Sequence, residues 1–161
     1  MKATTSQVIK QQVVYIPVKD LQRAKAFYAA VFEFDIDTFR QTDYSNGEKW
    51  VTFPLRKIDK QGDPILTGFS FLGLGYSPHL IPSQQGTLPF LPCDDIEATL
   101  ESVKKHGGSI IQGKTRDAYT SETKDKNIDL YHAYFIDTEG NKVALTYCRI
   151  STMLSIEQKN L

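Results

Sequence analysis

Three histidines are the side chains of this 161-residue chain that titrate nearest to neutral pH. His79 follows a proline in a predicted loop, and His106 ends a predicted helix, where the helix dipole favours a positive charge. His132 falls in a predicted strand and is the candidate catalytic residue. An exposed or hydrogen-bonded strand histidine is the simpler interpretation of His132.

Four carboxylates precede His132 or stand close to it in a long polar stretch at 113–129: Asp117, Glu122, Asp125 and Asp129. A loop of this length is typical of binding loops, lids or disordered segments. The sequence has no serine or cysteine nucleophile motif, no glycine-rich phosphate loop and no paired-cysteine motif. Asp94–Asp95 starts a predicted helix, so we interpret this pair as a helix cap and not as catalytic carboxylates.

Composition excludes several classes of partner. Nineteen basic and 19 acidic residues give a formal net charge of zero, so we expect no nucleic-acid or anionic-membrane face. No stretch is apolar for long enough to span a bilayer, and residues 1–12 lack the apolar run of a signal peptide. Cys93 and Cys148 fall in predicted strands without metal-type spacing, which indicates buried thiols in a reducing compartment. We therefore expect a cytoplasmic protein.

The stretch at 88–108 predicts a strand that leads directly into an amphipathic helix. Leu88–Cys93 is apolar at every position, so both faces of the strand should be covered. Asp94 is a suitable N-cap, Glu97 completes a capping-box pattern, and Gly107 is a suitable left-handed residue at the end of the helix.

The same order of strand, aspartate and helix occurs earlier, at 13–32. Aligning Asp20 with Asp95 gives a spacing of 75 residues and sets Tyr15 opposite Phe90 and a proline opposite a proline. The predicted inward stripe of the earlier helix is Leu21, Ala24, Tyr28 and Val31. A unit repeated at a fixed spacing predicts two similar modules.

Each strand–helix unit is followed by three further predicted strands. In the first half these are 34–40, 49–54 and 65–74, with a polar connector at 55–64. In the second half they are 109–112, 130–137 and 142–148, the last two forming a hairpin. We therefore predict one domain over 1–161, with a first module at 12–75, a linker at 76–86, a second module at 87–148 and a tail at 149–161.

Three stretches resemble the vicinal-oxygen-chelate superfamily, which groups glyoxalase I, bleomycin-resistance proteins and extradiol dioxygenases. They are V-x-D-L-x-x-A-x-x-F-Y at 18–28, D-D-I-E-A-T-L-E-S-V-K-K-H-G-G at 94–108 and F-I-D-T-E-G-N-K-V-A-L at 135–145. The resemblance extends over 12–148. It implies an α+β fold in which two βαβββ modules form a cupped mixed sheet, with helices outside, a ligand on the concave face and a homodimer.

The metal ligands of that superfamily do not carry over. Its enzymes bind a divalent ion with a histidine early in the first strand of each module and a carboxylate in the last. The corresponding positions here are Val13, Leu88 and Ala144, and the fourth lies within 65–75, which contains no acid or histidine. These side chains offer no nitrogen, oxygen or thiolate donor, and a shift of one residue does not restore the set. We expect no metal and no other cofactor.

The same face of the predicted cup carries apolar and aromatic side chains with a few hydroxyls, the usual lining of a small-molecule site. The candidate ligand-binding residues are Val13, Tyr15, Leu88, Phe90, Ala144 and Thr146, joined by Arg40 and Trp50 from neighbouring strands. The alternative is that these side chains pack together or against a second subunit.

The leading functional prediction is therefore a metal-independent small-molecule-binding protein related to these enzymes. One alternative is a lyase or isomerase of the glyoxalase class, in which His132 and acids from 113–129 hold a divalent metal. A second alternative is a structural or partner-binding module without a ligand.

Overall fold

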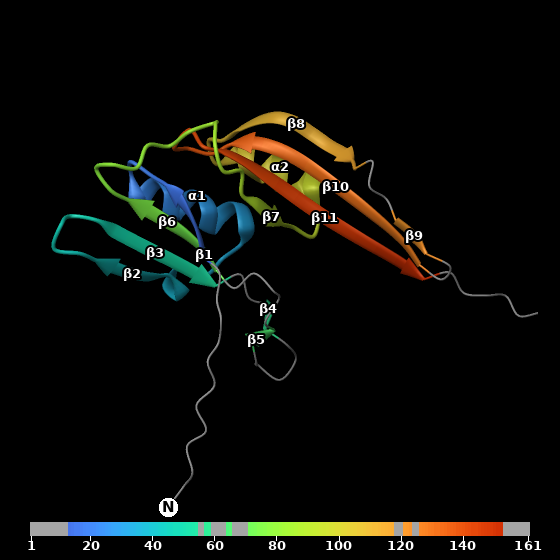
Figure 1. Cartoon of the computed structure of the whole chain (residues 1–161), viewed down its shortest axis with the longest axis horizontal. Helices are drawn as coiled ribbons and strands as arrows, with labels where there is room; N and C mark the ends of the chain where they lie inside the picture. Colours follow the sequence, from blue (N-terminus) through green and yellow to red (C-terminus); the bar gives the residue numbers. More distant parts are fainter. Residues whose placement is uncertain are drawn as a thin grey trace, which may run out of the picture.

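The computed structural model describes residues 13–54, 57–58, 64–65, 71–117, 121–123 and 126–152. Two sheets lie side by side, and the two helices lie near the line where the sheets meet (Figure 1). This is the α+β arrangement of paired βαβββ modules that the sequence predicts. Neither helix of the described part is long and apolar enough to cross a membrane.

The two sheets repeat one topology. The first sheet has the order β1 (Val13–Pro17), β6 (Phe71–Tyr76), β3 (Lys49–Pro54), β2 (Arg40–Asp43). The second has the order β7 (Phe90–Pro92), β11 (Lys142–Thr152), β10 (Lys126–Ile136), β8 (Ser109–Arg116), and β9 (Ser121–Thr123) adds to β10. In each sheet the strand before the helix pairs in parallel with the last strand of the same module along the chain, β1 with β6 and β7 with β11.

Both helices begin at a capping aspartate. α1 (Leu21–Phe32) follows Asp20, whose carboxylate accepts from the N–H of Arg23 at 3.0 Å. α2 (Ile96–Lys105) follows Asp95, which accepts from the N–H of Ala98 at 3.0 Å. The two first residues are 75 positions apart, which matches the predicted repeat.

One detail of the second cap was wrong. We predicted Asp94, but Asp95 is the residue with extended backbone whose carboxylate reaches the first turn of α2. That hydrogen bond from Ala98 lowers the pKa of Asp95. The predicted end of the helix is confirmed, because Gly107 adopts a left-handed φ of 95°.

A single core serves both modules. The predicted inward stripe of α1 is confirmed, since all four of its residues, Leu21, Ala24, Tyr28 and Val31, are buried. Phe27 of the same helix packs against Phe135 of β10, with ring centroids 6.1 Å apart. The hydroxyl of Ser102 in α2 donates to the carbonyl of Ala30 in α1 at 3.4 Å. The modules therefore share buried surface and do not fold around separate cores.

The predicted strand at 34–40 was wrong. Residues Ile36–Thr38 form a 3₁₀ turn, and β2 begins only at Arg40. The carboxylate of Asp35 caps this turn by accepting from the N–H of Asp37 at 3.0 Å, so a local hydrogen bond competes with strand pairing. Phe34 also stacks on Phe32, with centroids 5.7 Å apart, which turns the chain back onto α1.

The predicted long loop at 113–129 was also wrong, because much of it is strand. β8 extends to Arg116, β9 covers Ser121–Thr123 and β10 starts at Lys126. The guanidinium of Arg116 on β8 binds the carboxylate of Asp129 on β10, with Nε to Oδ1 at 3.1 Å. Cross-strand pairs of opposite charge stabilise this polar part of the sheet. Its sequence lacks the alternation of apolar and polar residues that would have predicted strands.

The remaining differences concern the ends of elements. β11 continues to Thr152, into the predicted tail, and β7 is shorter than predicted, so that Leu88 precedes it. The connector at 55–64 contributes to a two-stranded ribbon, β4 (Lys57–Ile58) with β5 (Pro64–Ile65). The predicted strand at 65–74 corresponds to β6, and its residues 66–70 lie outside the described part.

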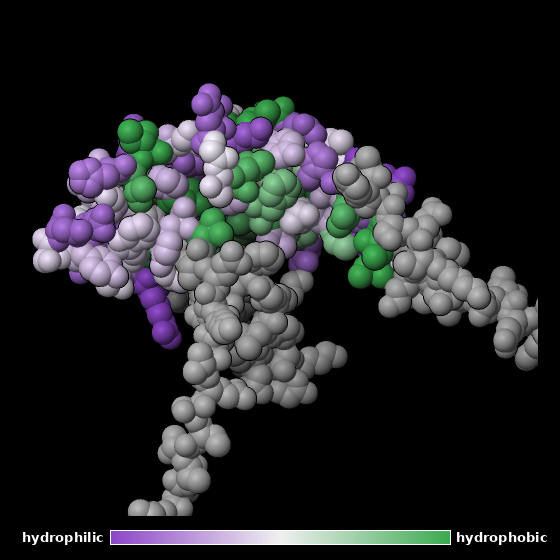
Figure 2. All heavy atoms as spheres, in the orientation of Figure 1, coloured by the Kyte–Doolittle hydropathy of each residue, from purple (hydrophilic) through white to green (hydrophobic). Residues whose placement is uncertain are grey.

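The outer part of the β10–β11 hairpin extends past the core, and apolar side chains gather over it at the right of Figure 2. Ile150 is 61% exposed there, and Cys148 is exposed. The expectation that both cysteines are buried was therefore wrong for Cys148. Hydrophilic side chains gather over the β2–β3 hairpin on the opposite side of the same view, in line with the exposure of every residue of β2.

A buried carboxylate joins the two modules. Asp137, at the turn after β10, is only 4% exposed. Its carboxylate accepts from the hydroxyl of Tyr28 at 2.8 Å and from the side-chain amide of Asn141 at 2.9 Å. The same amide donates to the carbonyl of Pro17 at the end of β1, at 2.8 Å. The turn of the second module is therefore fixed to both α1 and β1 of the first.

The next acidic residue of this turn binds the start of α1. Glu139 Oε2 accepts from the backbone N–H groups of Lys19 and Asp20, each at 2.9 Å, and Oε1 accepts from Arg23 Nε at 2.7 Å. The Glu139 side chain has no exposed surface. Burial raises the pKa of Glu139, but these hydrogen bonds outweigh it, so the pKa lies below its ordinary value.

We expect Tyr28→Phe to lower the free energy of unfolding by about 1–3 kcal/mol, because it removes one donor from a buried carboxylate. Urea unfolding measures this difference. Tyr44→Phe is the matched control, since Tyr44 is 53% exposed and should tolerate the change. Equal stability of the two variants would contradict the role assigned to the Tyr28 hydroxyl.

We expect Glu139→Gln to make stability less dependent on acid pH. The folded pKa of Glu139 lies below the unfolded value of 4.5, so its carboxylate stabilises the fold above that pH and the contribution is lost as the pH falls through the folded pKa. The stability gap between wild type and Glu139→Gln should therefore be widest near neutral pH and close in acid. Glu101→Gln, at an exposed ion pair, should show no such gap.

Candidate functional site

We define the concave face as the face of both sheets turned away from α1 and α2. On the first sheet it carries an aromatic pair, Tyr15 of β1 and Trp50 of β3. Their ring centroids are 4.5 Å apart and their planes are nearly perpendicular, at 77°. The Tyr15 hydroxyl lies 3.4 Å from Thr52 Oγ1, and Tyr15 remains 38% exposed. This pair forms an apolar wall with a hydroxyl at its edge.

Two glycines of β6 make room for this pair. A Cβ atom on Gly73 would lie 2.2 Å from the Tyr15 ring, and one on Gly75 would lie 2.7 Å from the Trp50 ring. Each glycine is paired in register with the strand that bears the ring beside it. The rings therefore lie directly on the backbone of β6, which only glycine permits.

On the second sheet the concave face carries Phe90 of β7 and Tyr134 of β10, with ring centroids 6.4 Å apart. Both residues flank Ala144 of β11, which pairs with each of them in register. The ring of His132 lies 5.2 Å from that of Tyr134. Phe90 is 52% exposed, so this second aromatic surface is also accessible to a ligand.

A cavity of about 230 Å³ lies at the seam between the sheets. It is lined by Tyr15 and its neighbours in β1, by residues of the 81–89 segment and by Lys142 of β11. The Lys142 ammonium lies 4.6 Å from the centroid of the Tyr134 ring, a cation–π distance. The seam therefore adjoins both aromatic pairs and adds one positive charge.

The structure groups the predicted ligand-binding residues by sheet. Tyr15 and Trp50 are in contact, and Phe90 and Ala144 are register partners, with Thr146 two residues further along β11. Arg40 is exposed on β2 and pairs with Thr52, whose hydroxyl is the one near Tyr15.

For two of the predicted ligand-binding residues, Leu88 and Val13, the structure gives no side-chain contact with the site. Leu88 is half-buried before β7, and although Thr87 and Pro89 line the seam cavity, Leu88 does not. The backbone of Val13 pairs with Phe71, and the Val13 side chain lies outside the described part.

Sequence reasoning missed Tyr134 and Lys142. Alternation along 130–137 puts Tyr134 on the same face as His132, which was the available signal. The same alternation along 142–148 puts Lys142 on the face of Ala144 and Thr146, but nothing in the sequence shows that its ammonium reaches the Tyr134 ring.

The register also locates the fourth metal position implied by the resemblance. Tyr15 pairs with Gly73, and Phe90, 75 residues later, pairs with Ala144. Gly73 therefore corresponds to Ala144, and neither residue has a donor atom. Among the described residues, no group of three or more His, Cys, Asp or Glu side chains could hold a metal ion. The side chains at these positions do not fit a divalent ion, and metal independence stays a prediction.

His132 has polar neighbours of its own. Its Nε2 lies 3.3 Å from the side-chain amide of Gln112, and its Nδ1 lies 3.9 Å from the carboxylate of Asp117. Asp129 binds Arg116 instead, and the side chains of Glu122 and Asp125 are outside the described part. A histidine with a carboxylate nearby has the parts of a general base, although 3.9 Å exceeds hydrogen-bond reach.

The other groups singled out by the sequence have structural roles. His106 Nδ1 lies 2.8 Å from the carbonyl of Ser102, which confirms its place at the end of α2. His79 is exposed in a loop, as predicted. Burial raises the pKa of the Cys93 thiol to about 11, so it is not a nucleophile near neutral pH.

The family model described as Glyoxalase/Bleomycin resistance protein/Dioxygenase superfamily matches residues 10–145. The chain belongs to this superfamily. No curated protein shows significant similarity to the chain.

Several solved structures share the fold at low sequence identity. A glyoxalase I mutant from Zea mays has a TM-score of 0.55 at 19% identity, over 83% of this chain and 44% of that one. UcmS2 has a TM-score of 0.51 at 21% identity, over 87% and 98% of the two chains. A glyoxylase/bleomycin resistance protein/dioxygenase domain from Frankia sp. EAN1pec also has a TM-score of 0.51, at 11% identity, over 89% and 100%. The chain thus spans less than half the length of the maize enzyme, and these similarities establish the fold alone.

We expect Gly73→Ala to displace the Tyr15 ring from β6 and so change the surroundings of Trp50, the only tryptophan of the chain. The measurement is the emission maximum and the quenching of tryptophan fluorescence. Gly113→Ala is the control, because a Cβ atom there meets no atom within 4 Å. Identical emission from both variants would show that the ring does not lie on Gly73 in solution.

Proposed function

We propose that this superfamily member is a metal-independent small-molecule-binding protein whose ligand lies on the concave face. The observation that carries the proposal is the pairing of two accessible aromatic surfaces, Tyr15 with Trp50 and Phe90 with Tyr134, on either side of the seam cavity. Aromatic walls with a few polar groups are typical of sites for planar apolar ligands.

The polar groups around these walls set the expected ligand chemistry. Lys142 supplies one positive charge beside Tyr134, and the Tyr15 and Thr52 hydroxyls supply donors on the opposite wall. A planar molecule with one anionic or strongly accepting group would match both features. Donor atoms are lacking at Gly73 and Ala144, which supports binding without a metal. A homodimer and a cytoplasmic location remain part of this proposal.

A lyase or isomerase of the glyoxalase class is the second candidate. The observation in its favour is the placement of His132 on the concave face, 3.9 Å from the carboxylate of Asp117 and next to the Tyr134 ring. In this function His132 would move a proton of a ligand bound on Tyr134 and Phe90.

The first experiment separates these functions by metal content. We expect protein purified without an affinity tag to contain no stoichiometric metal, and its melting temperature to be unchanged by nickel, zinc, manganese or iron. Elemental analysis and thermal melting measure both quantities. Stoichiometric metal, or a rise of several degrees that is lost in His132→Ala, would favour the enzyme.

The second experiment tests binding. We expect planar aromatic anions from a small-molecule library to quench Trp50 fluorescence in the presence of a chelator, and Tyr15→Ala to weaken this binding about tenfold or more. Tyr44→Ala, at an exposed tyrosine of the β2–β3 turn, is the matched control. A concave face that binds nothing in this screen would favour the structural or partner-binding module.

A further inference from the structure

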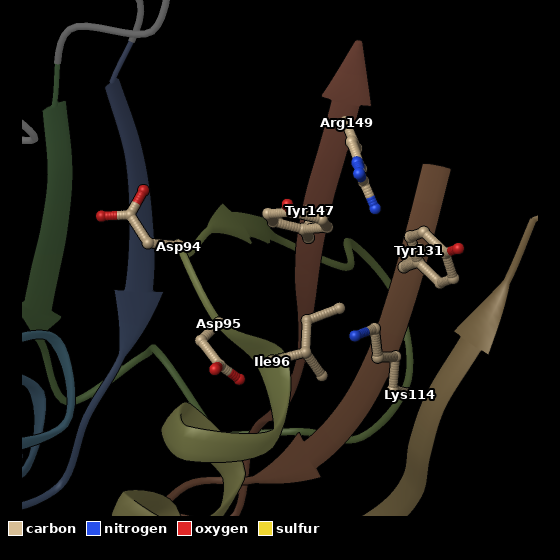
Figure 3. A pocket seen from close by; sticks show the side chains of 7 residues that line it. All are labelled: Asp94, Asp95, Ile96, Lys114, Tyr131, Tyr147 and Arg149. Atoms are coloured by element: carbon tan, nitrogen blue, oxygen red, sulfur yellow. The ribbon is translucent and has the colours of Figure 1, made fainter. Parts of the chain in front are cut away.

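A second cavity, of about 180 Å³, lies on the helix side of the second sheet, beside the start of α2 (Figure 3). Tyr131 of β10 and Tyr147 of β11 form its floor and alternate along their strands with His132 and Thr146 of the concave face. Side chains of successive strand residues point to opposite faces. This cavity is therefore separate from the proposed ligand site.

The floor of the cavity is aromatic. Tyr131 and Tyr147 are register partners with ring centroids 6.1 Å apart. The Lys114 ammonium lies 5.1 Å from the centroid of the first ring and 5.8 Å from that of the second. Ile96, the first residue of α2, lines the cavity from the helix. A flat apolar group would have the two tyrosine rings to pack against.

Two cations face this floor, and one of them has no partner in the described part of the chain. Lys114 Nζ binds Glu97 Oε2 at 3.0 Å. Arg149 pairs in register with Asp129, but that carboxylate binds Arg116. The Arg149 guanidinium makes no hydrogen bond or ion pair with a described residue, and Figure 3 shows it directed toward the space between the two tyrosines.

Asp94 and Asp95 line the helix end of the same cavity, on the other side of it from Arg149 in Figure 3. Asp95 Oδ1 accepts from the N–H of Ala98 as the cap of α2. The Asp94 carboxylate points away from the two cations in Figure 3. The two cations, Lys114 and Arg149, therefore lie at the end of the cavity near β10 and β11.

We propose that this cavity binds a small aryl carboxylate, with the carboxylate on Arg149 and the ring on Tyr131 and Tyr147. Arginine recognises carboxylates through paired N–H donors, and the tyrosine pair supplies the surface for a ring. The volume equals that of about six waters, which limits the ligand to one ring. The site does not depend on the function proposed for the concave face.

Isothermal titration of the full chain with benzoate tests the site. We expect benzoate to bind with a dissociation constant of about 1 mM, and neutral benzamide and inorganic phosphate to bind about tenfold more weakly or not at all. Arg149→Gln should weaken benzoate binding about tenfold. Arg149 is exposed on β11, so the variant should fold, and far-ultraviolet circular dichroism checks this.

Lys105→Gln is the control, because it removes an exposed cation at the end of α2 that does not line the cavity, and it should leave benzoate binding unchanged. Trp50 emission should also stay constant, since Trp50 lies on the first sheet. Arg40→Gln changes a candidate residue of the concave face, so loss of binding in this variant with a change of Trp50 emission would place benzoate on that face and overturn the proposal. No heat of binding at about 20 mM benzoate, or equal binding of benzoate and phosphate, would also overturn it.

Discussion

The carboxylate of Asp137 is the group on which the relative position of the two modules depends. It is buried, and a buried charge is tolerated only where hydrogen bonds replace its water. Its oxygens accept from the Tyr28 hydroxyl, from the side-chain amide of Asn141 and from the backbone N–H groups of Glu139 and Asn141. Burial raises the pKa of Tyr28 well above its usual value, which keeps the phenol protonated as a donor. One of these donors belongs to α1 of the other module, so any shift between the modules would remove a hydrogen bond from the buried carboxylate.

The position of the seam follows from this constraint. Asn141 donates to Pro17 at the end of β1, and its side-chain oxygen accepts from the N–H of Ser83 at 3.0 Å. The next residue, Lys142, reaches both the seam cavity and the ring of Tyr134. A turn that is fixed by buried hydrogen bonds therefore sets the distance between Tyr15 on one sheet and the aromatic pair on the other. The width of the concave face is therefore fixed by the hydrogen bonds that hold this turn against β1 and Ser83.

Local signals predicted the fold well wherever a side chain bonds to nearby backbone. Asp20 and Gly107 marked a helix start and a helix end because each acts within one turn of its own position. The sequence motif that contains Asp137 and Glu139 was recognised as a hairpin, but its contacts lie 109 to 120 residues away and no local pattern reveals them. The polar strand β9 was missed for a different reason: its partners in β10 are only a few positions away, but this pairing leaves no apolar alternation.

The candidate site was predicted in part. Tyr15 and Phe90 were found because the 75-residue repeat gives them equivalent places, and the repeat is visible in the sequence. Trp50 was also predicted as a candidate, but its contact with Tyr15 depends on the register of three strands and needed the structure. Lys142 and Tyr134 were missed although alternation along their strands puts them on the same face as Ala144 and His132, because their contact with each other needs the structure.

The register of the paired strands gives a steric reason for the absence of the family's metal ligands at these positions. In each module the residue opposite the first-strand aromatic is small: Gly73 faces Tyr15, and Ala144 faces Phe90. At Gly73 the tyrosine ring occupies the space that any Cβ would need, so a carboxylate there is sterically incompatible with the observed ring position. An aromatic surface and a metal-binding carboxylate are thus alternatives at this position, and the chain has the aromatic one. Restoring an acid at Gly73 would have to displace Tyr15 first, so the metal site and the aromatic wall could not coexist in this module.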